Sequence, residues 1–288
     1  MDYSRHNFSG RIRWRIIAFM STQTDSRRDG VWAQPYELAS GQTQHHKLGH
    51  VRLWVTLLDQ EWQVRSETRA PETDPVGWTE SIGHQLPQTS VSLQRFIRQG
   101  DSSVVTFIPA VANLPTVIRP YHPLTIPGGA RCTIYVGTVV WMKICAGASQ
   151  TLLTEVPLAA PSYTWVGRNT MEGELCYSSS SFGRLVLDAL PKRPWRATTP
   201  VTIINRRTEP LVLERFSLPT PLLSLHLNER GQLWTPGVVV EVATDMNSAS
   251  LHVDEALLVA AGPCVKVAPA REKPAKGRLV RAIDRVFG

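Results

Sequence analysis

Several features are scarce in this 288-residue sequence, and each shortage argues against a class of protein. Only 19% of the residues are charged, which argues against a coiled coil or a highly charged disordered chain. No apolar run approaches the ~18 residues of a membrane-spanning helix, so we expect no integral membrane protein. The four cysteines form no C-x-x-C pair, which argues against zinc and a disulfide framework. We expect thiols packed in a cytoplasmic protein.

Recognisable catalytic motifs are also missing. We find no glycine-rich nucleotide-binding motif, no H-E-x-x-H and no G-x-S-x-G. Glu172 and Glu174 resemble a carboxylate pair, but two solvated acids beside a strand are the simpler interpretation. The run 178–181 consists of serines with no neighbouring base, and it indicates a loop. The best metal candidates are three histidines, His45, His46 and His50, but no carboxylate lies among them. We therefore predict no catalytic residue, no metal and no cofactor.

The net charge of +7 lies at the two ends of the chain. Residues 1–30 carry +3 and residues 265–288 carry +5, whereas residues 31–264 carry −1. A nearly neutral body lacks the excess of Lys and Arg that binds the phosphates of a nucleic acid, so we expect no nucleic-acid partner. Residues 1–30 are predicted to be a disordered basic extension, in which Met20 is an alternative start.

What the sequence does contain is a repeated alternation of apolar and polar side chains with a period of two. Val51–Leu57 and Glu61–Arg65 alternate on either side of Asp59-Gln60, which predicts a β-hairpin. Further strands are predicted at Cys132–Val136, Val139–Ile144, Leu185–Leu187, Val201–Ile204, Leu211–Phe216, Leu223–Leu227 and Val238–Val242. Short strands separated by turn signals predict an all-β fold of antiparallel β-sandwiches.

The 21 prolines indicate where these strands are interrupted. The polar stretch 67–90 contains three of them, and we expect a long loop or a lid there. Two more, at 157 and 161, indicate a boundary. The sequence therefore predicts a first sandwich half or domain over residues 31–160 and a second over residues 161–262.

Residues 263–288 are predicted to form a Pro/Lys linker followed by a short amphipathic helix. On a helical wheel the apolar residues from Leu279 to Phe287 share about 120° of arc, and the charged residues occupy the other side. Some ten residues do not hold a helix alone, so the apolar face needs a surface to cover it. The expected partner-binding residues are Arg278, Leu279, Val280, Arg281, Ile283, Arg285 and Phe287. Packing against the chain's own sandwich is the alternative interpretation.

Two further features suggest binding surfaces. Prolines at 120, 123 and 127 hold an extended stretch that presents Arg119, Tyr121 and His122, a candidate recognition loop. The same stretch also fits a structural crossover. Nine tryptophans are unusually many; core filling is the simpler explanation, and exposed rings for sugar stacking are the alternative.

The sequence also resembles a prokaryotic family known as domain-of-unknown-function family 432. The resemblance rests on Trp32–Leu38, Leu53-Trp54 with Glu61-Trp62, Arg119–Pro127, Tyr135–Thr138, Glu172–Tyr177, Thr199–Val201, Ile204-Asn205 and Leu213–Arg215. It implies no known activity and no catalytic residues. Members of this family are often encoded beside small-conductance mechanosensitive channels, so the resemblance implies an accessory role.

Three hypotheses for the function follow. The first is a non-catalytic cytoplasmic interaction protein whose C-terminal helix binds a protein partner, such as a mechanosensitive channel, or the anionic inner membrane surface. The second is a β-sandwich module that binds a carbohydrate or another small ligand. The third is an enzyme that uses Arg119, Tyr121, His122 and Glu174, provided that the fold brings these groups together.

Overall fold

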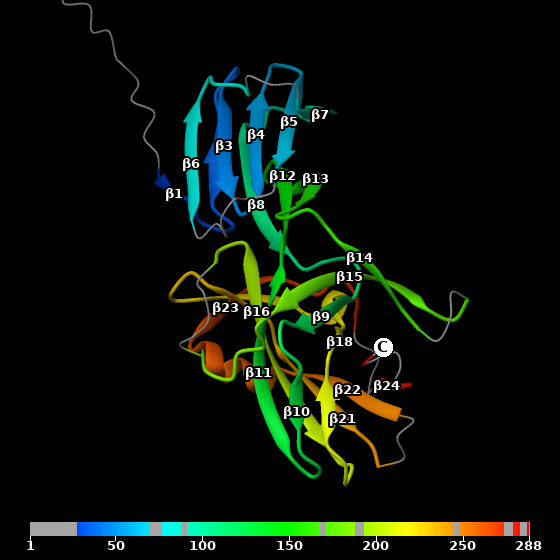
Figure 1. Cartoon of the computed structure of the whole chain (residues 1–288). Helices are drawn as coiled ribbons and strands as arrows, with labels where there is room; N and C mark the ends of the chain where they lie inside the picture. The colour runs from blue at the N-terminus through cyan, green and yellow to red at the C-terminus, as the bar shows by residue number, and fades with distance from the viewer. Residues whose placement is uncertain are drawn as a thin grey trace, which may run out of the picture.

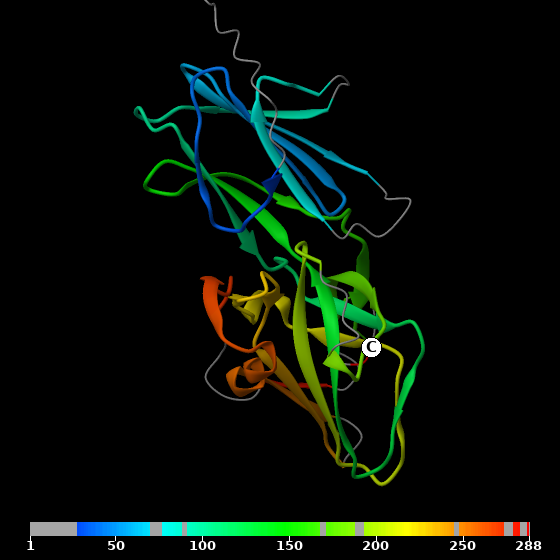
Figure 2. The same ribbon diagram turned by 90° about the vertical axis from the view of Figure 1, so that its left-hand side faces the viewer.

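The alternating residues of the sequence form β-strands that assemble into two lobes. The computed structural model describes residues 28–69, 77–87, 91–167, 171–187, 193–244, 248–273, 279–282 and 287. The described elements are strands, apart from short 3₁₀ helices. One lobe lies above the other in Figure 1, and the turned view in Figure 2 shows the same division. The predicted fold class is therefore confirmed. Within the described part of the chain, no helix has the length and apolar character that crossing a membrane requires.

The upper lobe in Figure 1 consists of two antiparallel sheets. The six-stranded sheet has the order β1 (Arg28–Asp29), β6 (Trp78–Gly83), β3 (Thr43–Leu48), β4 (Val51–Leu57), β5 (Glu61–Thr68) and β7 (Ser92–Ile97). The four-stranded sheet has the order β13 (Thr151–Pro157), β12 (Trp141–Ala146), β8 (Val104–Ala110) and β2 (Pro35–Glu37). The expected hairpin is confirmed, because Val51 to Leu57 of β4 pair with Thr68 to Trp62 of β5.

The lower lobe contains the remaining strands. Its largest sheet has the order β23 (Cys264–Ala268), β19 (Leu225–Asn228), β20 (Leu233–Trp234), β16 (Arg196–Asn205), β21 (Gly237–Val242), β22 (Ser248–Asp254) and β24 (Leu279–Ala282), with β11 (Arg131–Val139) on the other edge of β16. A second sheet has the order β14 (Tyr163–Val166), β15 (Glu174–Ser181), β9 (Thr116–Pro120) and β18 (Phe216–Leu218). The other elements are the pair β10 (Leu124–Ile126) and β17 (Leu211–Leu213), and the 3₁₀ helices η2 (Thr220–Leu222) and η3 (Glu255–Ala261).

The chain passes between the lobes more often than one boundary near residue 160 allows. β9, β10 and β11 precede that boundary, but they pair with β15, β17 and β16, which follow it. β16 also pairs in parallel with β20 and β21, and β15 pairs in parallel with β9. Long connections are needed to place parallel neighbours side by side, and such pairings cannot be recognised from local alternation.

Three local predictions are wrong. The stretch 67–90 is not one long loop, because β6 lies within it and joins the six-stranded sheet. Ser178 to Ser181 are not a loop but the end of β15. The expected strand Leu185–Leu187 does not form; Leu185 and Val186 are 62% and 61% exposed.

The C-terminal helix and its linker are corrected where the structure describes them. Residues 264–268 form β23 instead of a linker, with Pro263 and Pro269 at its two ends, where proline does not interrupt the ladder. Residues 279–282 form β24, which pairs with β22 from Leu251↔Leu279 to Ser248↔Ala282. A sheet edge supplies backbone partners that a short isolated helix lacks, and this favours the strand. Arg278, Ile283 and Arg285 lie outside the described residues.

Buried side chains join the two lobes at a narrow waist. Trp195, just before β16, packs beside the turn at Gly49, where a Cβ would lie 2.8 Å from the Trp195 ring. Gly49 also has φ +58°, so a side chain is disfavoured there for two reasons. Arg271, which follows β23 of the lower lobe, forms an ion pair with Glu155 of β13 in the upper lobe. Its Nε also donates to the Val111 carbonyl, just after β8, at 2.7 Å. One cluster of buried apolar residues therefore continues through both lobes.

A buried polar cluster stabilises the upper lobe. His46 of β3 is 1% exposed, and its Nδ1 accepts a hydrogen bond of 3.0 Å from Trp78 Nε1. The Phe107 ring lies 4.1 Å from the imidazole, and the Tyr36 hydroxyl donates to Glu80 beside it. Burial lowers the pKa of His46 from 6.5 to about 3, so the folded protein holds this ring neutral.

We expect His46 to make folding stability fall as the solution becomes acidic. The unfolded chain takes up a proton near pH 6.5, whereas the folded chain resists it down to about pH 3. Stability is therefore complete above pH 6.5 and is lost progressively as the pH falls from 6.5 towards 3. Between pH 7 and pH 5 this one group should lower the free energy of unfolding by about 2 kcal/mol. Urea unfolding of the wild type and H46Q at both pH values measures the difference.

The matched control is the exposed histidine His84. H84Q should show the same loss between pH 7 and pH 5 as the wild type, whereas H46Q should lose about 2 kcal/mol less. Equal losses in all three proteins would show that His46 does not carry the effect.

Candidate functional site

The three residues of the predicted recognition loop lie in two elements, the strand β9 and the turn that follows it. Arg119 lies at the end of β9, is exposed and donates from Nη2 to Thr164 Oγ1 at 3.2 Å, towards β14. Tyr121 and His122 follow in an exposed turn. The Tyr121 backbone N–H donates to the Ser181 carbonyl at 2.9 Å, so the turn is fixed to the end of β15. Tyr121 lines a cleft to which Arg119 and His122 do not contribute.

This cleft lies between the end of β15 and the face of the sheet formed by β11, β16 and β20. The space in it that water-sized molecules can occupy is about 80 Å³, and the cleft is partly open to solvent. We call it the arginine cleft and define it by the residues that line it: Tyr121, Tyr135, Gly137, Ser180, Ser181, Phe182, Arg184, Arg193, Arg196, Thr198, Gln232 and Leu233. Its volume is well below that of a site for a drug-sized ligand.

Arg196 forms part of the floor of the arginine cleft. It is the first residue of β16, and Val139 opposite it ends β11. Its Nη2 donates to the Gly137 carbonyl at 2.7 Å and to Ser179 Oγ at 3.1 Å. A Cβ on Gly137 would lie 3.3 Å from Arg196 Nε, so glycine leaves room for the guanidinium to lie along β11. The position of this cation is therefore determined by sheet backbone.

Arg184 lies on the opposite edge of β11 from β16. Its backbone exchanges two hydrogen bonds with Tyr135, of 2.7 and 3.1 Å, in an isolated bridge. Its guanidinium carbon is 4.5 Å from the centre of the Phe182 ring, a cation–π distance. Its buried Nε makes no hydrogen bond with any residue that the structure describes. Arg184 thus lines the cleft from a backbone position that the pairing with Tyr135 fixes.

The electrostatic character of the arginine cleft is positive. Three arginines line it, and none of its twelve described lining residues is acidic. Guanidinium groups stay charged and match the paired oxygens of phosphate or carboxylate groups. The same residues include no histidine, cysteine or carboxylate that would serve as a general base. This arrangement is suited to holding an anion.

The comparison with protein families shows to which family the chain belongs. A family model described as "Protein of unknown function (DUF432)" matches residues 32–287. The chain belongs to the DUF432 family. The resemblance seen in the sequence is thereby confirmed. Neither the curated proteins nor the solved structures contain a match.

The four groups of the enzyme hypothesis do not come together in this DUF432 protein. Arg119 pairs with Ser180 across the parallel ladder of β9 and β15. Glu174 lies six positions earlier on β15, so the two Cα atoms are about 20 Å apart. Arg119 and Glu174 therefore cannot act on the same atom of a substrate, and the geometry gives this hypothesis no support.

The three candidate metal ligands also lie apart. His45 stacks on Trp54, with ring centres 4.9 Å apart, and His50 packs against Trp195 at 4.9 Å. His46 is buried on the opposite face of β3 from His45. Within the described ranges, no three His, Cys, Asp or Glu residues are grouped as metal ligands. Each of the three rings instead packs against aromatic neighbours.

Most tryptophans fill the interior of this family member. Those with less than 9% exposure are Trp32, Trp54, Trp62, Trp78, Trp195 and Trp234. Trp141 is half-buried, and Trp165 is 43% exposed. A flat platform of exposed tryptophans for sugar stacking is therefore missing from the described residues. The four cysteines form no disulfide, and burial raises the pKa of the Cys132 and Cys145 thiols, which keeps them protonated.

The C-terminal residues contact the protein's own lower lobe. Leu279, Val280 and Arg281 lie in β24, whose backbone pairs with β22. Phe287 packs against the main apolar cluster, and its carbonyl accepts a hydrogen bond of 3.2 Å from Arg215 Nε. These contacts favour the alternative interpretation of the tail, in which it folds back on the sandwich.

Sequence reasoning missed Arg184, Arg193 and Arg196. Three single arginines in a 13-residue stretch form no motif, and the stretch has no clear period. The only local signal is that Arg193 and Arg196 flank Pro194-Trp195 immediately before a strand. The pairing of β11 with β16 and with Arg184 is what brings these cations to one cleft.

Proposed function

We propose that this DUF432 protein is a non-catalytic binding protein that holds an anionic group, a phosphate or a carboxylate, in the arginine cleft. The observation that carries the proposal is the convergence of Arg184, Arg193 and Arg196 on one cleft without an acidic residue among its described lining. Guanidinium groups gathered at one cleft attract an anion, and their planar donors match its paired oxygens. The proposal develops the small-ligand hypothesis of the sequence analysis with a different set of residues.

The surrounding groups support anion binding in two ways. The Gly137 carbonyl and Ser179 hydroxyl hold Arg196 in place, so little side-chain freedom is lost when a ligand binds. Ser180, Ser181 and Thr198 line the same cleft and can donate further hydrogen bonds to an oxyanion. Fixed cations with neutral hydroxyl donors around them are typical of sites that recognise phosphate groups.

Thermal unfolding with matched ligands tests the proposal. Glycerol 3-phosphate should raise the melting temperature, and glycerol at the same concentration should not, because only the phosphate interacts with the arginines. A ligand at 100 times its Kd stabilises the folded state by about 2.7 kcal/mol. Sodium chloride at the same ionic strength controls for general salt effects. No difference among the three solutions at 10 mM, together with no heat of binding, would refute the proposal.

A second candidate function is protein docking, favoured by the hairpin of β14 and β15. This hairpin extends away from the rest of the lower lobe in Figure 1. It exposes large apolar side chains: Tyr163 (57%), Trp165 (43%), Met171 (91%) and Leu175 (46%). Trp165 and Leu175 are cross-strand partners, so their side chains lie on the same face. Apolar side chains gathered on a projecting element are typical of protein-binding surfaces.

The partner that the family resemblance implies for this surface is the cytoplasmic part of a small-conductance mechanosensitive channel. We assign the docking role to the hairpin and not to residues 278–287, because the described part of that tail contacts the lower lobe. A pull-down with the purified channel should lose most of its signal for W165S/L175S. V212S, which alters an exposed apolar residue elsewhere, should keep it. Equal capture of all variants would refute this second candidate.

A further inference from the structure

Exposed apolar side chains line the arginine cleft and directly follow one of its arginines. Tyr121 and Phe182 are 57% and 59% exposed, and their ring centres lie 4.6 Å apart. Leu185 and Val186 follow Arg184 directly and are 62% and 61% exposed. These four residues come from two chain segments, which the hydrogen bond from the Tyr121 N–H to the Ser181 carbonyl joins. The bonds between Arg184 and Tyr135 attach the second segment to β11. We call them the apolar rim.

The apolar rim has no evident role if the ligand is a small soluble anion. Four large apolar side chains in water are unfavourable, and a phosphate ion within the cleft would leave Leu185 and Val186 as exposed as before. The apolar rim is explained by a ligand whose anionic group lies beside apolar groups that can cover the rim. Amphipathic and aromatic groups beside arginines suit the interface of a bilayer, where phosphates lie directly above the acyl chains.

We propose that the anion in the arginine cleft is the phosphate of an anionic phospholipid, and that the apolar rim inserts into the surface of the bilayer around it. This inference rests on the proposed function, since it needs the cleft to bind phosphate. Charge complementarity favours a membrane as the occupant, because cations near an anionic leaflet each contribute to attraction. Tyr121 is suited to the boundary, with its ring in the apolar zone and its hydroxyl in the headgroups.

Flotation with lipid vesicles tests the inference. The wild type should bind vesicles of phosphatidylcholine with 30% phosphatidylglycerol, and should bind pure phosphatidylcholine vesicles far less. The variant L185S/V186S removes the part of the rim that does not line the cleft. It should reduce partitioning to the anionic vesicles by at least about tenfold, since two apolar side chains no longer enter the interface. Its affinity for free glycerol 3-phosphate, measured by calorimetry, should be unchanged.

The matched control is I97S/L152S, which removes two apolar side chains that are 80% and 51% exposed on β7 and β13 of the upper lobe. It should bind vesicles like the wild type, and circular dichroism should show that both variants are folded. If glycerol 3-phosphate binds but the rim variant still floats with the vesicles, the inference is overturned and the proposed function stands. If neither vesicles nor glycerol 3-phosphate bind, both fail. If the rim variant loses only capture by the channel, the rim is a protein contact and the inference is also overturned.

Discussion

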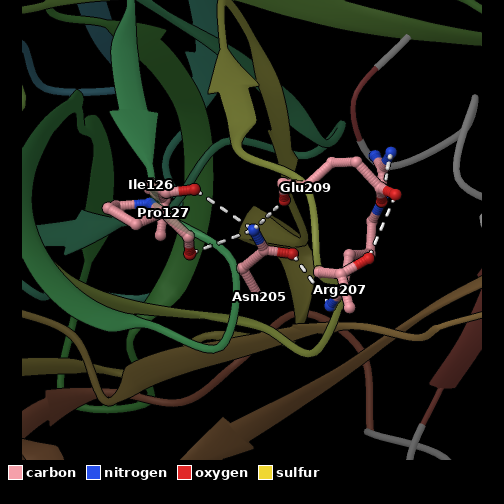
Figure 3. Close-up of polar contacts among 6 residues, drawn as sticks. Ile126, Pro127, Asn205, Arg207 and Glu209 are labelled. Atoms are coloured by element: carbon pink, nitrogen blue, oxygen red, sulfur yellow. Dashed lines mark hydrogen bonds and ion pairs between the residues drawn. The ribbon is translucent and has the colours of Figure 1, made fainter.

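Replacement of Asn205 by alanine is expected to lower the free energy of unfolding by about 3 kcal/mol, because one buried amide connects the turn after β16 to the end of β10. Asn205 ends β16 and is 0% exposed. Its Nδ2 donates to the carbonyls of Ile126 at 3.1 Å, Pro127 at 3.2 Å and Glu209 at 2.9 Å (Figure 3). Its Oδ1 accepts a hydrogen bond of 3.2 Å from the Arg207 backbone N–H.

The large effect comes from the groups that the substitution leaves behind. A hydrogen bond contributes about 1 kcal/mol net, but a buried carbonyl or N–H that loses its partner costs a further 1–3 kcal/mol, roughly. Ile126 ends β10, the strand that follows the turn carrying Tyr121, and Pro127 comes directly after it. N205A should therefore also loosen one wall of the arginine cleft and weaken binding of glycerol 3-phosphate.

Urea unfolding followed by circular dichroism measures the change in stability. T208A is the control, since Thr208 lies in the same turn and is exposed, and its hydroxyl donates to the neighbouring Glu209 side chain at 3.0 Å. It should change stability by less than about 0.5 kcal/mol. A loss below about 1 kcal/mol for N205A would show that these segments do not depend on its amide.

Replacement of Arg196 by methionine is expected to weaken binding of glycerol 3-phosphate on the order of thirtyfold. Methionine keeps much of the apolar stem and removes the charge, and hydrogen bonds to charged groups contribute about 1.5–3 kcal/mol. R184M should have an effect of similar size, because its guanidinium lines the same cleft. The double variant should bind too weakly to detect. Isothermal titration calorimetry at low salt measures all three affinities.

R119M provides the matched control for this series. Arg119 is exposed near the cleft but contacts Thr164 and does not line the cleft, so its loss should change affinity less than about twofold. R196K is informative as well, because lysine keeps the charge but not the planar pair of donors. Affinities for R184M and R196M equal to that for R119M would place phosphate binding, if any, elsewhere on the protein.

The parts of the fold that were predictable are those in which local alternation determines the structure. The hairpin of β4 and β5 is visible in the sequence because its inward residues are apolar and its turn is short. β6 was missed because its second inward residue is Glu80, a buried carboxylate that accepts from Tyr36 and breaks the apolar alternation. At β24 the sequence also fits an amphipathic helix. The segment forms a strand because the edge of β22 supplies backbone hydrogen-bond partners.

The candidate site was less predictable than the fold, for a physical reason. Tyr121 could be proposed from its rigid proline-rich surroundings, and it does line the cleft. Arg184 and Arg196 reach that cleft through pairing with β11, about 50 residues earlier in the chain. Gly137, which leaves room for Arg196, is unremarkable as a glycine within an alternating strand. Pairing between distant segments creates this site, and local alternation does not show which segments pair.

The most direct test of the central claim, that the arginine cleft is an anion site, is a crystal structure with glycerol 3-phosphate at a concentration that saturates binding in solution. The account predicts the phosphate within hydrogen-bonding distance of the guanidinium groups of Arg184 and Arg196, beside Tyr121. A ligand bound outside this cleft, with both arginines making no contact to it, would contradict the account.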